Sequence, residues 1–144
     1  MIYKLTLTYN NKKGGFMTKK LELYKCEICG NIAEIIIEGQ GELICCGEPM
    51  KLLTEKKDMT EMAEKHIPEI SDFNETHQKL SVAKHPMLPD HYIVFIEGYS
   101  KEKNEHYLKY FLPDEKPEFM VPKSDNLSAR GYCNIHGLWG NSFK

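Results

Sequence analysis

The 144-residue sequence contains no long hydrophobic segment. No run approaches the ~18 consecutive apolar residues that a membrane-spanning helix needs. The first sixteen residues, MIYKLTLTYNNKKGGF, lack the apolar region and the small-residue cleavage site of a signal peptide. Because 41% of the residues are hydrophobic, the chain can still build a core. We therefore expect a soluble globular protein located in the cytoplasm.

The sequence also lacks the charge and the motifs of several large functional classes. A formal net charge of −2 argues against a nucleic-acid partner, since binding to phosphate needs a basic surface. There is no glycine-rich phosphate loop, no nucleophile elbow and no internal repeat. Any chemistry must therefore come from other residues, and the cysteines and histidines are the candidates.

Residues 1–16 precede a second methionine, Met17, which begins the segment MTKKLELYKCEICG. The codons for KKGGFM can include a purine-rich ribosome-binding sequence at a plausible distance before an ATG codon. We therefore expect residues 1–16 to be a translated leader or a disordered extension, with Met17 as the true start. The alternative is a real N-terminal strand, because IYKLTLTY alternates between apolar and polar residues.

Residues 17–53 are predicted to form a small metal-binding domain. Short strand-like segments surround turns here, and about 37 residues bury too little surface to fold without a metal or a partner subunit. Cys26 and Cys29 form a C-x-x-C motif, and after fifteen further residues Cys45 and Cys46 are adjacent. In a reducing cytoplasm such clusters bind metal more often than they form disulfides, so we expect a tetrahedral site with four thiolates.

The cysteine spacing leaves both zinc and iron open. A zinc ribbon would normally repeat C-x-x-C in its second turn, whereas this sequence has two adjacent cysteines, which favours iron. The distinction matters because zinc has no accessible redox change. With iron the domain would carry electrons, and with zinc it would be only a structural site.

Residues 54–144 carry closely spaced β-strand signals. The strand-like segments are QKLSVAKH, HYIVFIEGYS, HYLKYFLP, EFMVP, LSARGYCN and LWGNSF, and turn-rich pieces such as SKEKNE and PDEKP separate them. Several short strands punctuated in this way favour an antiparallel β-sandwich. The one helical signal that we identify is a possible turn at DMTEMAEK.

Four of the six histidines lie in loop-like segments, and the fifth cysteine lies close to the last of them; the set is His66, His85, His91, His136 and Cys133. Any one of these histidines alone would more often be structural than a metal ligand. Together with the cysteine they make five possible ligands. The other two, His77 and His106, lie in polar surroundings, where a solvated or strand-surface histidine is expected.

The sequence resembles the desulfoferrodoxins, the two-iron form of superoxide reductase, from Met17 to Trp139. The segments that carry the resemblance are YKCEICGN, ELICCGEPMKLL, EKHIP, HPM, HY and GYCNIHGLW, in the family's order and with closely matching spacings. The resemblance implies an all-β fold, in which a small rubredoxin- or desulforedoxin-like metal module precedes an immunoglobulin-like antiparallel β-sandwich.

The resemblance also implies two iron ions per chain. One iron would be held by Cys26, Cys29, Cys45 and Cys46. The second would have His66, His85, His91 and His136 as equatorial ligands and Cys133 as an axial thiolate. Five donors leave one position of an octahedral iron open for substrate, and the thiolate would donate electron density along the same axis. The expected reaction is the one-electron reduction of superoxide to hydrogen peroxide, which makes the protein a superoxide reductase.

Two charged residues beside the first histidine gain a role only from the resemblance. It implies that Glu64 is a sixth ligand of the resting ferric iron. Lys65 would attract the anionic substrate and organise a water that donates a proton. Without the resemblance, both would be interpreted as a solvated loop pair, because charged surface residues are commonplace.

Two other functions stay open from the sequence. The first is a zinc-binding scaffold or interaction module. The second is an electron carrier whose second iron is closed by a protein ligand and never meets substrate. For the reductase, the resemblance implies rubredoxin or a related small carrier as the electron donor. Since the small module has so little core, we also expect a homodimer that forms through it.

Overall fold

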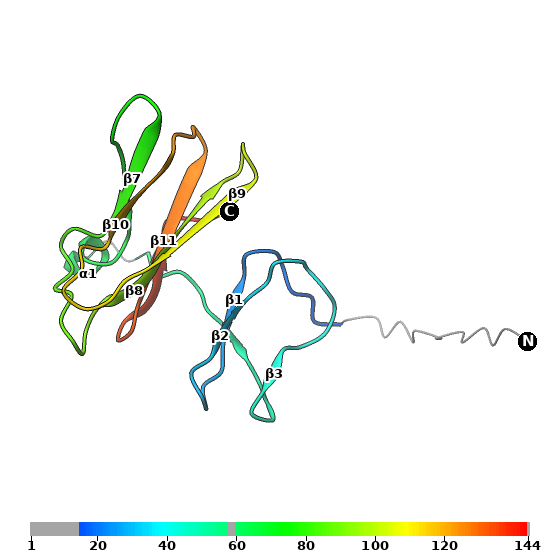
Figure 1. The fold of residues 1–144 in the computed structure, drawn as a ribbon. Helices are drawn as coiled ribbons and strands as arrows, with labels where there is room; N and C mark the ends of the chain where they lie inside the picture. Colours follow the sequence, from blue (N-terminus) through cyan, green and yellow to red (C-terminus); the bar gives the residue numbers. More distant parts are fainter. Residues whose placement is uncertain (1–14, 58–59, 144) are drawn as a thin grey trace, which may run out of the picture. The chain divides into compact units, whose positions relative to one another are not determined.

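The computed structural model describes residues 15–57 and 60–143. These residues form two compact units, and the division falls between Leu52 and Leu53. Figure 1 shows the strands of both units. The predicted domain limits, 17–53 and 54–144, stay a prediction, although this division lies one residue from the predicted boundary.

The first unit is built from five very short strands. Strands β1 (Leu23–Lys25), β2 (Ile32–Glu34) and β5 (Lys51–Leu52) form an antiparallel sheet in the order β2-β1-β5. Strands β3 (Ile44–Cys45) and β4 (Glu48–Pro49) form a separate hairpin. The strands are shorter than the predicted segments because the chain turns again after two or three residues.

The core of the first unit is small. Leu21, Leu23, Tyr24 and Cys26 are the buried hydrophobic residues between positions 15 and 52. Several large apolar side chains of this unit are exposed instead, among them Ile36 and Ile37. So little buried apolar surface agrees with the expectation that the module needs a metal or a partner to fold.

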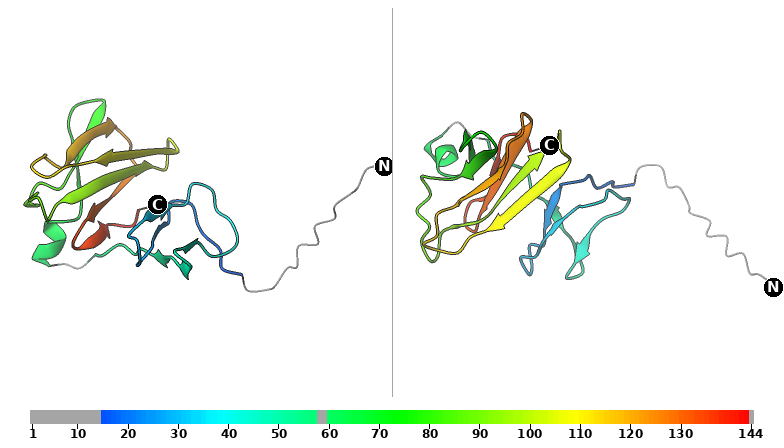
Figure 2. Two further views of the ribbon diagram at one scale, coloured as in Figure 1. Left: turned by 60° about the horizontal axis from the view of Figure 1, so that its bottom comes forward. Right: turned by 45° about the horizontal axis from the view of Figure 1, so that its top comes forward.

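The second unit is a β-sandwich with one helical turn. One antiparallel sheet has the order β10-β7-β6 and consists of β6 (Glu69–Asp72), β7 (His77–Ser81) and β10 (Glu118–Pro122). The other has the order β12-β11-β8-β9 and consists of β8 (Ile93–Ser100), β9 (Glu105–Tyr110), β11 (Leu127–Cys133) and β12 (Gly137–Gly140). Helix α1 (Glu61–Glu64) lies at one end of the sandwich (Figures 1 and 2).

The two sheets of the sandwich share one hydrophobic core. Leu80 and Val121 from the first sheet pack with Ile96 and Ala129 from the second. Gly98 on β8 allows a close approach between the sheets, because a Cβ at this position would lie 2.6 Å from Cδ1 of Leu80. The core therefore fixes the ends of β8 and β11, next to which the candidate ligands lie.

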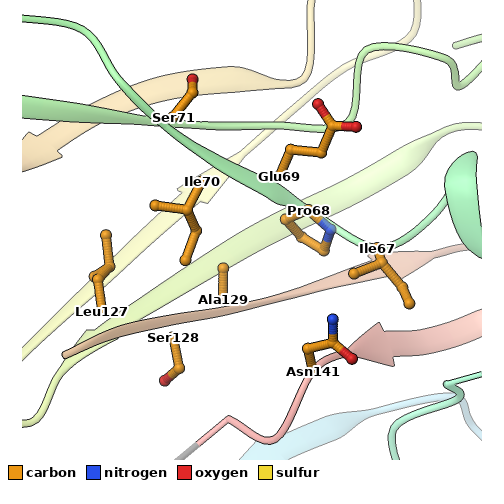
Figure 3. Close-up of a pocket in the computed structure, with 9 residues that line it drawn as sticks. All are labelled: Ile67, Pro68, Glu69, Ile70, Ser71, Leu127, Ser128, Ala129 and Asn141. Atoms are coloured by element: carbon orange, nitrogen blue, oxygen red, sulfur yellow. The ribbon is translucent and has the colours of Figure 1, made fainter. Parts of the chain in front are cut away.

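The fold class predicted from the sequence is confirmed: the protein is all-β, with a small module followed by an antiparallel sandwich. The predicted strand EFMVP coincides with β10. Strand β6 was not predicted, because its four residues are all exposed and show no clear alternation. Its edge borders a shallow groove towards β11, lined by Ile67, Pro68, Glu69, Ile70, Ser71, Leu127, Ser128, Ala129 and Asn141 (Figure 3).

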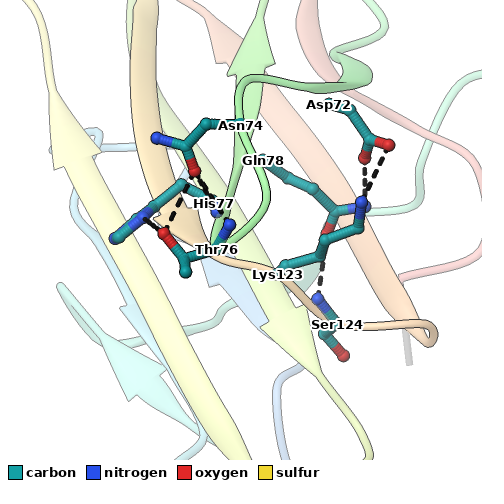
Figure 4. A network of polar contacts seen from close by, with 7 residues as sticks. All are labelled: Asp72, Asn74, Thr76, His77, Gln78, Lys123 and Ser124. Carbon is teal, nitrogen blue, oxygen red and sulfur yellow. Dashed lines mark hydrogen bonds and ion pairs between the residues drawn. The ribbon is translucent and has the colours of Figure 1, made fainter.

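The turn from β6 to β7 is held by polar side chains (Figure 4). The Asn74 carboxamide oxygen accepts hydrogen bonds from the backbone N–H groups of Thr76 and His77, at 2.9 and 2.8 Å. Lys123 on the segment after β10 pairs with Asp72 at 2.9 Å. These contacts fix the register between β6, β7 and β10 at the end of the sheet.

Most of the predicted leader lies outside the described residues, which begin at residue 15. Two backbone contacts do concern its last residue and the methionine that follows. The Phe16 carbonyl accepts a hydrogen bond from the N–H of Gly41 at 2.8 Å, and Met17 forms an antiparallel bridge with Gln40. Among the described residues, no helix is long and apolar enough to cross a membrane.

Candidate metal centres

The four cysteines of the first unit lie together, as the spacing predicts. Their sulfur atoms all lie within 4.8 Å of one another, with 3.5 Å between Cys29 and Cys45 and 4.0 Å between Cys45 and Cys46. A metal bound tetrahedrally by four thiolates at about 2.3 Å would separate neighbouring sulfurs by about 3.8 Å. The four side chains therefore fit a tetrahedral metal ion with little rearrangement.

Two tight turns present these sulfurs. The Cys29 N–H donates to the Cys26 sulfur at 3.5 Å, and the Gly30 N–H donates to the Cys26 carbonyl at 2.9 Å. Gly30 and Gly47 both have φ of +80°, a conformation that glycine adopts without strain. Each turn therefore ends in a glycine directly after its second cysteine.

Neighbouring groups shift the pKa of three of these four thiols, Cys26, Cys45 and Cys46. The backbone N–H of Cys29 lowers the pKa of Cys26 to about 6, against the opposing effect of burial. The neighbouring sulfurs, with Cys29 first, raise the pKa of Cys46 to about 12. The neighbouring sulfurs thus oppose ionisation of Cys45 and Cys46, and a bound cation would relieve this repulsion. The donor chemistry agrees with a metal site.

The four predicted histidines of the second unit form a square of imidazole rings. Around the square, the centroid distances are 4.9 Å for His66–His85, 4.6 Å for His85–His91, 4.7 Å for His91–His136 and 4.8 Å for His136–His66. Neighbouring rings are nearly perpendicular, with interplanar angles of 73° to 88°. His66 and His91 lie opposite each other, 6.2 Å apart.

Three of the rings point nitrogen atoms at a common centre. Nδ1 of His136 lies 3.0 Å from Nε2 of His66 and 3.1 Å from Nε2 of His91. Two nitrogen donors at a right angle around a metal, each about 2.1 Å from it, lie about 3.0 Å apart. Nδ1–H of His66 donates a hydrogen bond to the Met62 carbonyl at 2.6 Å. The lone pair on Nε2 is therefore available to bind a metal. The spacing fits adjacent ligands of one ion.

His85 completes the square, although the group of donors that lie within 4.8 Å of one another does not include it. Within the described residues, its Nε2 is buried without a hydrogen-bond partner. Burial, followed by the neighbouring histidines, lowers the pKa of His85 to about 4. A buried, neutral nitrogen without a partner is chemically suited to bind a metal.

Burial also lowers the pKa of His66 and of His136, and in both cases nearby histidines and Lys56 lower the pKa further. Neutral imidazoles have a lone pair free for a metal, and no proton has to be displaced first.

Cys133 supplies a sulfur beside the square. It is the last residue of β11 and is completely buried, and its sulfur belongs to the same group of donors as those of His66, His91 and His136. A three-residue loop carries the chain from Cys133 back to Gly137, which has φ of +78°. The loop brings the Cys133 sulfur to 3.8 Å from Nδ1 of His136, and the backbone N–H of His136 donates to the same sulfur at 3.4 Å.

Glu64 and Lys65 lie directly before His66, at the end of α1. The Glu64 carboxylate accepts a hydrogen bond from the Lys84 ammonium at 2.7 Å, and this ion pair lowers the pKa of Glu64. Both side chains of the pair are exposed. Lys65 is also exposed and forms no ion pair within the part of the chain that the structure describes. The sequence did not predict the pair between Glu64 and Lys84.

The remaining histidines lie away from this cluster, on strands. His77 begins β7 and is exposed, and His106 lies on β9 with its Nε2 3.4 Å from the buried carboxylate of Glu97. Two residues near the histidine square were not predicted to have a role there: Trp139, whose ring stacks on His66, and Lys56, which contacts the His136 carbonyl. The position of Trp139 after C-x-x-H-G-x could have indicated it, whereas the sequence contains no signal for Lys56.

The comparisons with known proteins match both units. The protein-family model of the desulfoferrodoxin N-terminal domain matches residues 18–53, and the family model of desulfoferrodoxin matches residues 58–142. A desulfoferrodoxin homologue from Archaeoglobus fulgidus is 45% identical, covering 85% of this chain and 98% of its own. A superoxide reductase from Pyrococcus horikoshii is 33% identical, covering 54% of this chain and 84% of its own.

A solved structure agrees at the level of the fold. The crystal structure of the superoxide reductase from Treponema pallidum matches with a TM-score of 0.60 and 22% identity, covering 85% of this chain and 98% of that one. The two family models together span nearly all of the described residues, and both ligand clusters lie inside the matched ranges. The chain therefore belongs to the desulfoferrodoxin family.

Proposed function

We propose that the protein is a superoxide reductase, which adds one electron and two protons to superoxide and releases hydrogen peroxide. The observation that carries the proposal is the square of four imidazole rings with the buried Cys133 sulfur beside it. The relative from Pyrococcus horikoshii, which is named a superoxide reductase, supports it. Membership of the desulfoferrodoxin family supports an oxidoreductase with two metal sites.

We propose iron at both sites. Imidazole and thiolate together suit several transition metals, but only a redox metal serves a one-electron reaction. When bound by His66, His85, His91, His136 and Cys133, iron would supply the electron by passing from the ferrous to the ferric state. The iron of the small module would be bound by Cys26, Cys29, Cys45 and Cys46 and would carry electrons.

The protein's own residues have distinct parts in this proposal. The Cys133 thiolate is the strongest electron donor of the five and favours release of the product. Lys65 attracts the superoxide anion and holds a water that donates a proton. Glu64 would be a further ligand of the iron in the resting ferric state. Since the structure pairs Glu64 with Lys84, we propose that the carboxylate rests on this lysine when it is not a ligand.

The proposed partners follow from the reaction and from the exposed surface. The protein must be reduced again after each turnover, and we propose a rubredoxin-like electron carrier as the donor. We also propose a homodimer formed through the small module, because Ile36, Ile37 and other apolar side chains are exposed on it. All five cysteines are free thiols, which suits a reducing compartment such as the cytoplasm.

The stoichiometry of the reaction tests the proposal. The protein is expressed anaerobically, its metal content is measured, and pulse-generated superoxide is added to the reduced form. We expect two irons per chain, one hydrogen peroxide per superoxide consumed, and no dioxygen. Dioxygen formed alongside peroxide would indicate a dismutase. Zinc in both sites, or an iron that superoxide does not oxidise, would contradict the proposal and favour a scaffold or an electron carrier.

A further inference from the structure

Trp139 forms one wall of the histidine cluster. Its side chain is 3% exposed, and its ring stacks on His66 with 4.9 Å between centroids and an angle of 25°. The indole N–H donates a hydrogen bond to the His136 carbonyl at 3.1 Å. A single side chain therefore contacts two of the proposed ligands, one through its face and one through its edge.

Lys56 contacts the same two groups from the outside. Its ammonium donates to the His136 carbonyl at 2.7 Å and lies 5.5 Å from the centre of the Trp139 ring. The His136 carbonyl thus accepts two hydrogen bonds, and one of the donors carries a positive charge. An ammonium at this distance from an indole face also forms a cation–π interaction.

The backbone holds Lys56 at this position. The Lys56 N–H donates to the Leu138 carbonyl at 3.0 Å, and the Gly140 N–H donates to the Lys56 carbonyl at 3.4 Å, so the segment pairs in parallel with β12. The next residue, Lys57, points its ammonium elsewhere and donates to the Ser142 hydroxyl at 2.8 Å. Adjacent lysines on one segment thus differ in what they contact.

A fixed positive charge beside a redox metal stabilises the reduced state, because that state carries one positive charge less. Lys56 acts on the cluster through the His136 carbonyl and through the ring that stacks on His66.

We propose that Lys56 is a positioning residue which, with Trp139, favours the reduced form of the metal bound by the four histidines and Cys133. The inference rests on the proposed function, in so far as that site must hold a redox metal. The proposal gives a role to the segment around Lys56, which contributes none of the five proposed ligands.

The experiment measures the ferric-to-ferrous ratio of this site in the whole, iron-loaded protein at fixed solution potentials, by absorption and by electron paramagnetic resonance. Lys56→Met should raise the ratio about three- to fivefold at low salt, since one exposed charge is lost. A tenfold change would correspond to about 59 mV in the midpoint potential. Lys56→Arg, which keeps the charge, should leave the ratio near that of the wild type.

Lys57→Met is the matched control, because it removes the same charge from the neighbouring residue, whose ammonium donates to Ser142 instead. The control should change the ratio by much less than Lys56→Met. Trp139→Phe keeps an aromatic face on His66 and removes the N–H donor, and it should shift the ratio in the same direction as Lys56→Met. Added salt should reduce the effect of Lys56→Met, because it screens the charge.

Iron content and unfolding are measured on every variant. If Lys56→Met lowers iron content or stability while the ratio in the iron-loaded fraction stays unchanged, the role is structural and the inference is wrong. Equal ratios in Lys56→Met and Lys57→Met also overturn it, even when the wild type reduces superoxide normally. A wild-type protein that takes up no redox metal in the histidine site overturns both this inference and the proposed function.

Discussion

Cys133 and His136 are held together by the short loop that joins β11 to β12. The loop places Nδ1 of His136 3.8 Å from the Cys133 sulfur, and this sulfur also accepts a hydrogen bond from the backbone N–H of His136. Hydrogen bonds of this kind reduce the charge on a thiolate and fix its direction. At the residue scale, the donor strength of the Cys133 sulfur therefore depends on His136, which the loop holds beside it.

Replacing Cys133 with serine should separate metal binding from catalysis. The hydroxyl is harder and largely protonated, so it donates much less electron density to a metal than the thiolate does. We expect iron to be retained by the four histidines, the long-wavelength ferric absorption band to be lost, and turnover to fall by at least tenfold. Visible spectroscopy and stopped-flow kinetics measure both effects. Unchanged spectrum and rate would show that Cys133 is not a ligand.

Lys65 and Lys84 differ in how far their charges are compensated. Lys84 pairs with Glu64, whereas Lys65 has no ion pair among the residues described here. Lys65→Met should therefore slow the first encounter with superoxide by about tenfold, and added salt should slow the wild type more than the variant. Rates with pulse-generated superoxide over a salt series provide the measurement.

Glu64→Ala is the control for this experiment. It should leave the encounter rate almost unchanged and alter mainly the ferric spectrum, because the proposed sixth ligand is removed. Equal rates and equal salt dependence in Lys65→Met and the wild type would show that Lys65 does not attract superoxide to the site.

At the scale of elements, each proposed metal site depends on a different set of turns and strands. The four-cysteine site uses only residues 26–46, whereas the histidine site combines α1, the loop before β8 and the hairpin of β11 and β12. Cys46→Ser should therefore abolish the first site's absorption and leave that of the second unchanged. Reduction of superoxide by a chemically reduced sample should survive. Loss of both absorption bands in this variant would show that the two sites are interdependent.

The contact between β8 and β7 predicts a stability effect. A Cβ at Gly98 would lie 2.6 Å from the fully buried Leu80 side chain, so Gly98→Val should destabilise the sandwich by about 1–3 kcal/mol. Urea denaturation can be followed by the fluorescence of the single tryptophan. In a Leu80→Ala background the same change should cost less, because the truncated side chain leaves room. Additive costs would mean that the two residues do not compete for space.

The sequence predicts elements better than it predicts contacts between side chains. Alternation of apolar and polar residues identified most strands, and β10 was predicted with its observed limits. The ligand set followed from the family resemblance, since spacing alone does not bring His66 and His136, seventy residues apart, into contact. Strand β6, the ion pair of Glu64 with Lys84, and the position of Lys56 depend on tertiary packing. No local pattern in the sequence encodes them.

At the scale of the whole molecule, the exposed apolar side chains of the first unit predict self-association. Ile37 is 85% exposed, and Ile37→Lys should convert a dimer into a monomer. Leu112 in the sandwich is 67% exposed, and Leu112→Lys should leave the dimer intact. Sedimentation equilibrium at micromolar concentrations measures both. A wild-type protein that sediments as a monomer would contradict the proposed dimer.

The two ligand sets also differ in when they can be completed during synthesis. All four cysteine ligands have been made once residue 46 has left the ribosome, and their site closes a short stretch of chain. The histidine site waits for residue 136, because His136 is one of its proposed ligands and lies 3.0 Å from His66. Because domains generally fold in order from the N-terminus, the small module can take up its metal while the sandwich is still being made. A shortage of iron during translation would then leave the second site empty first.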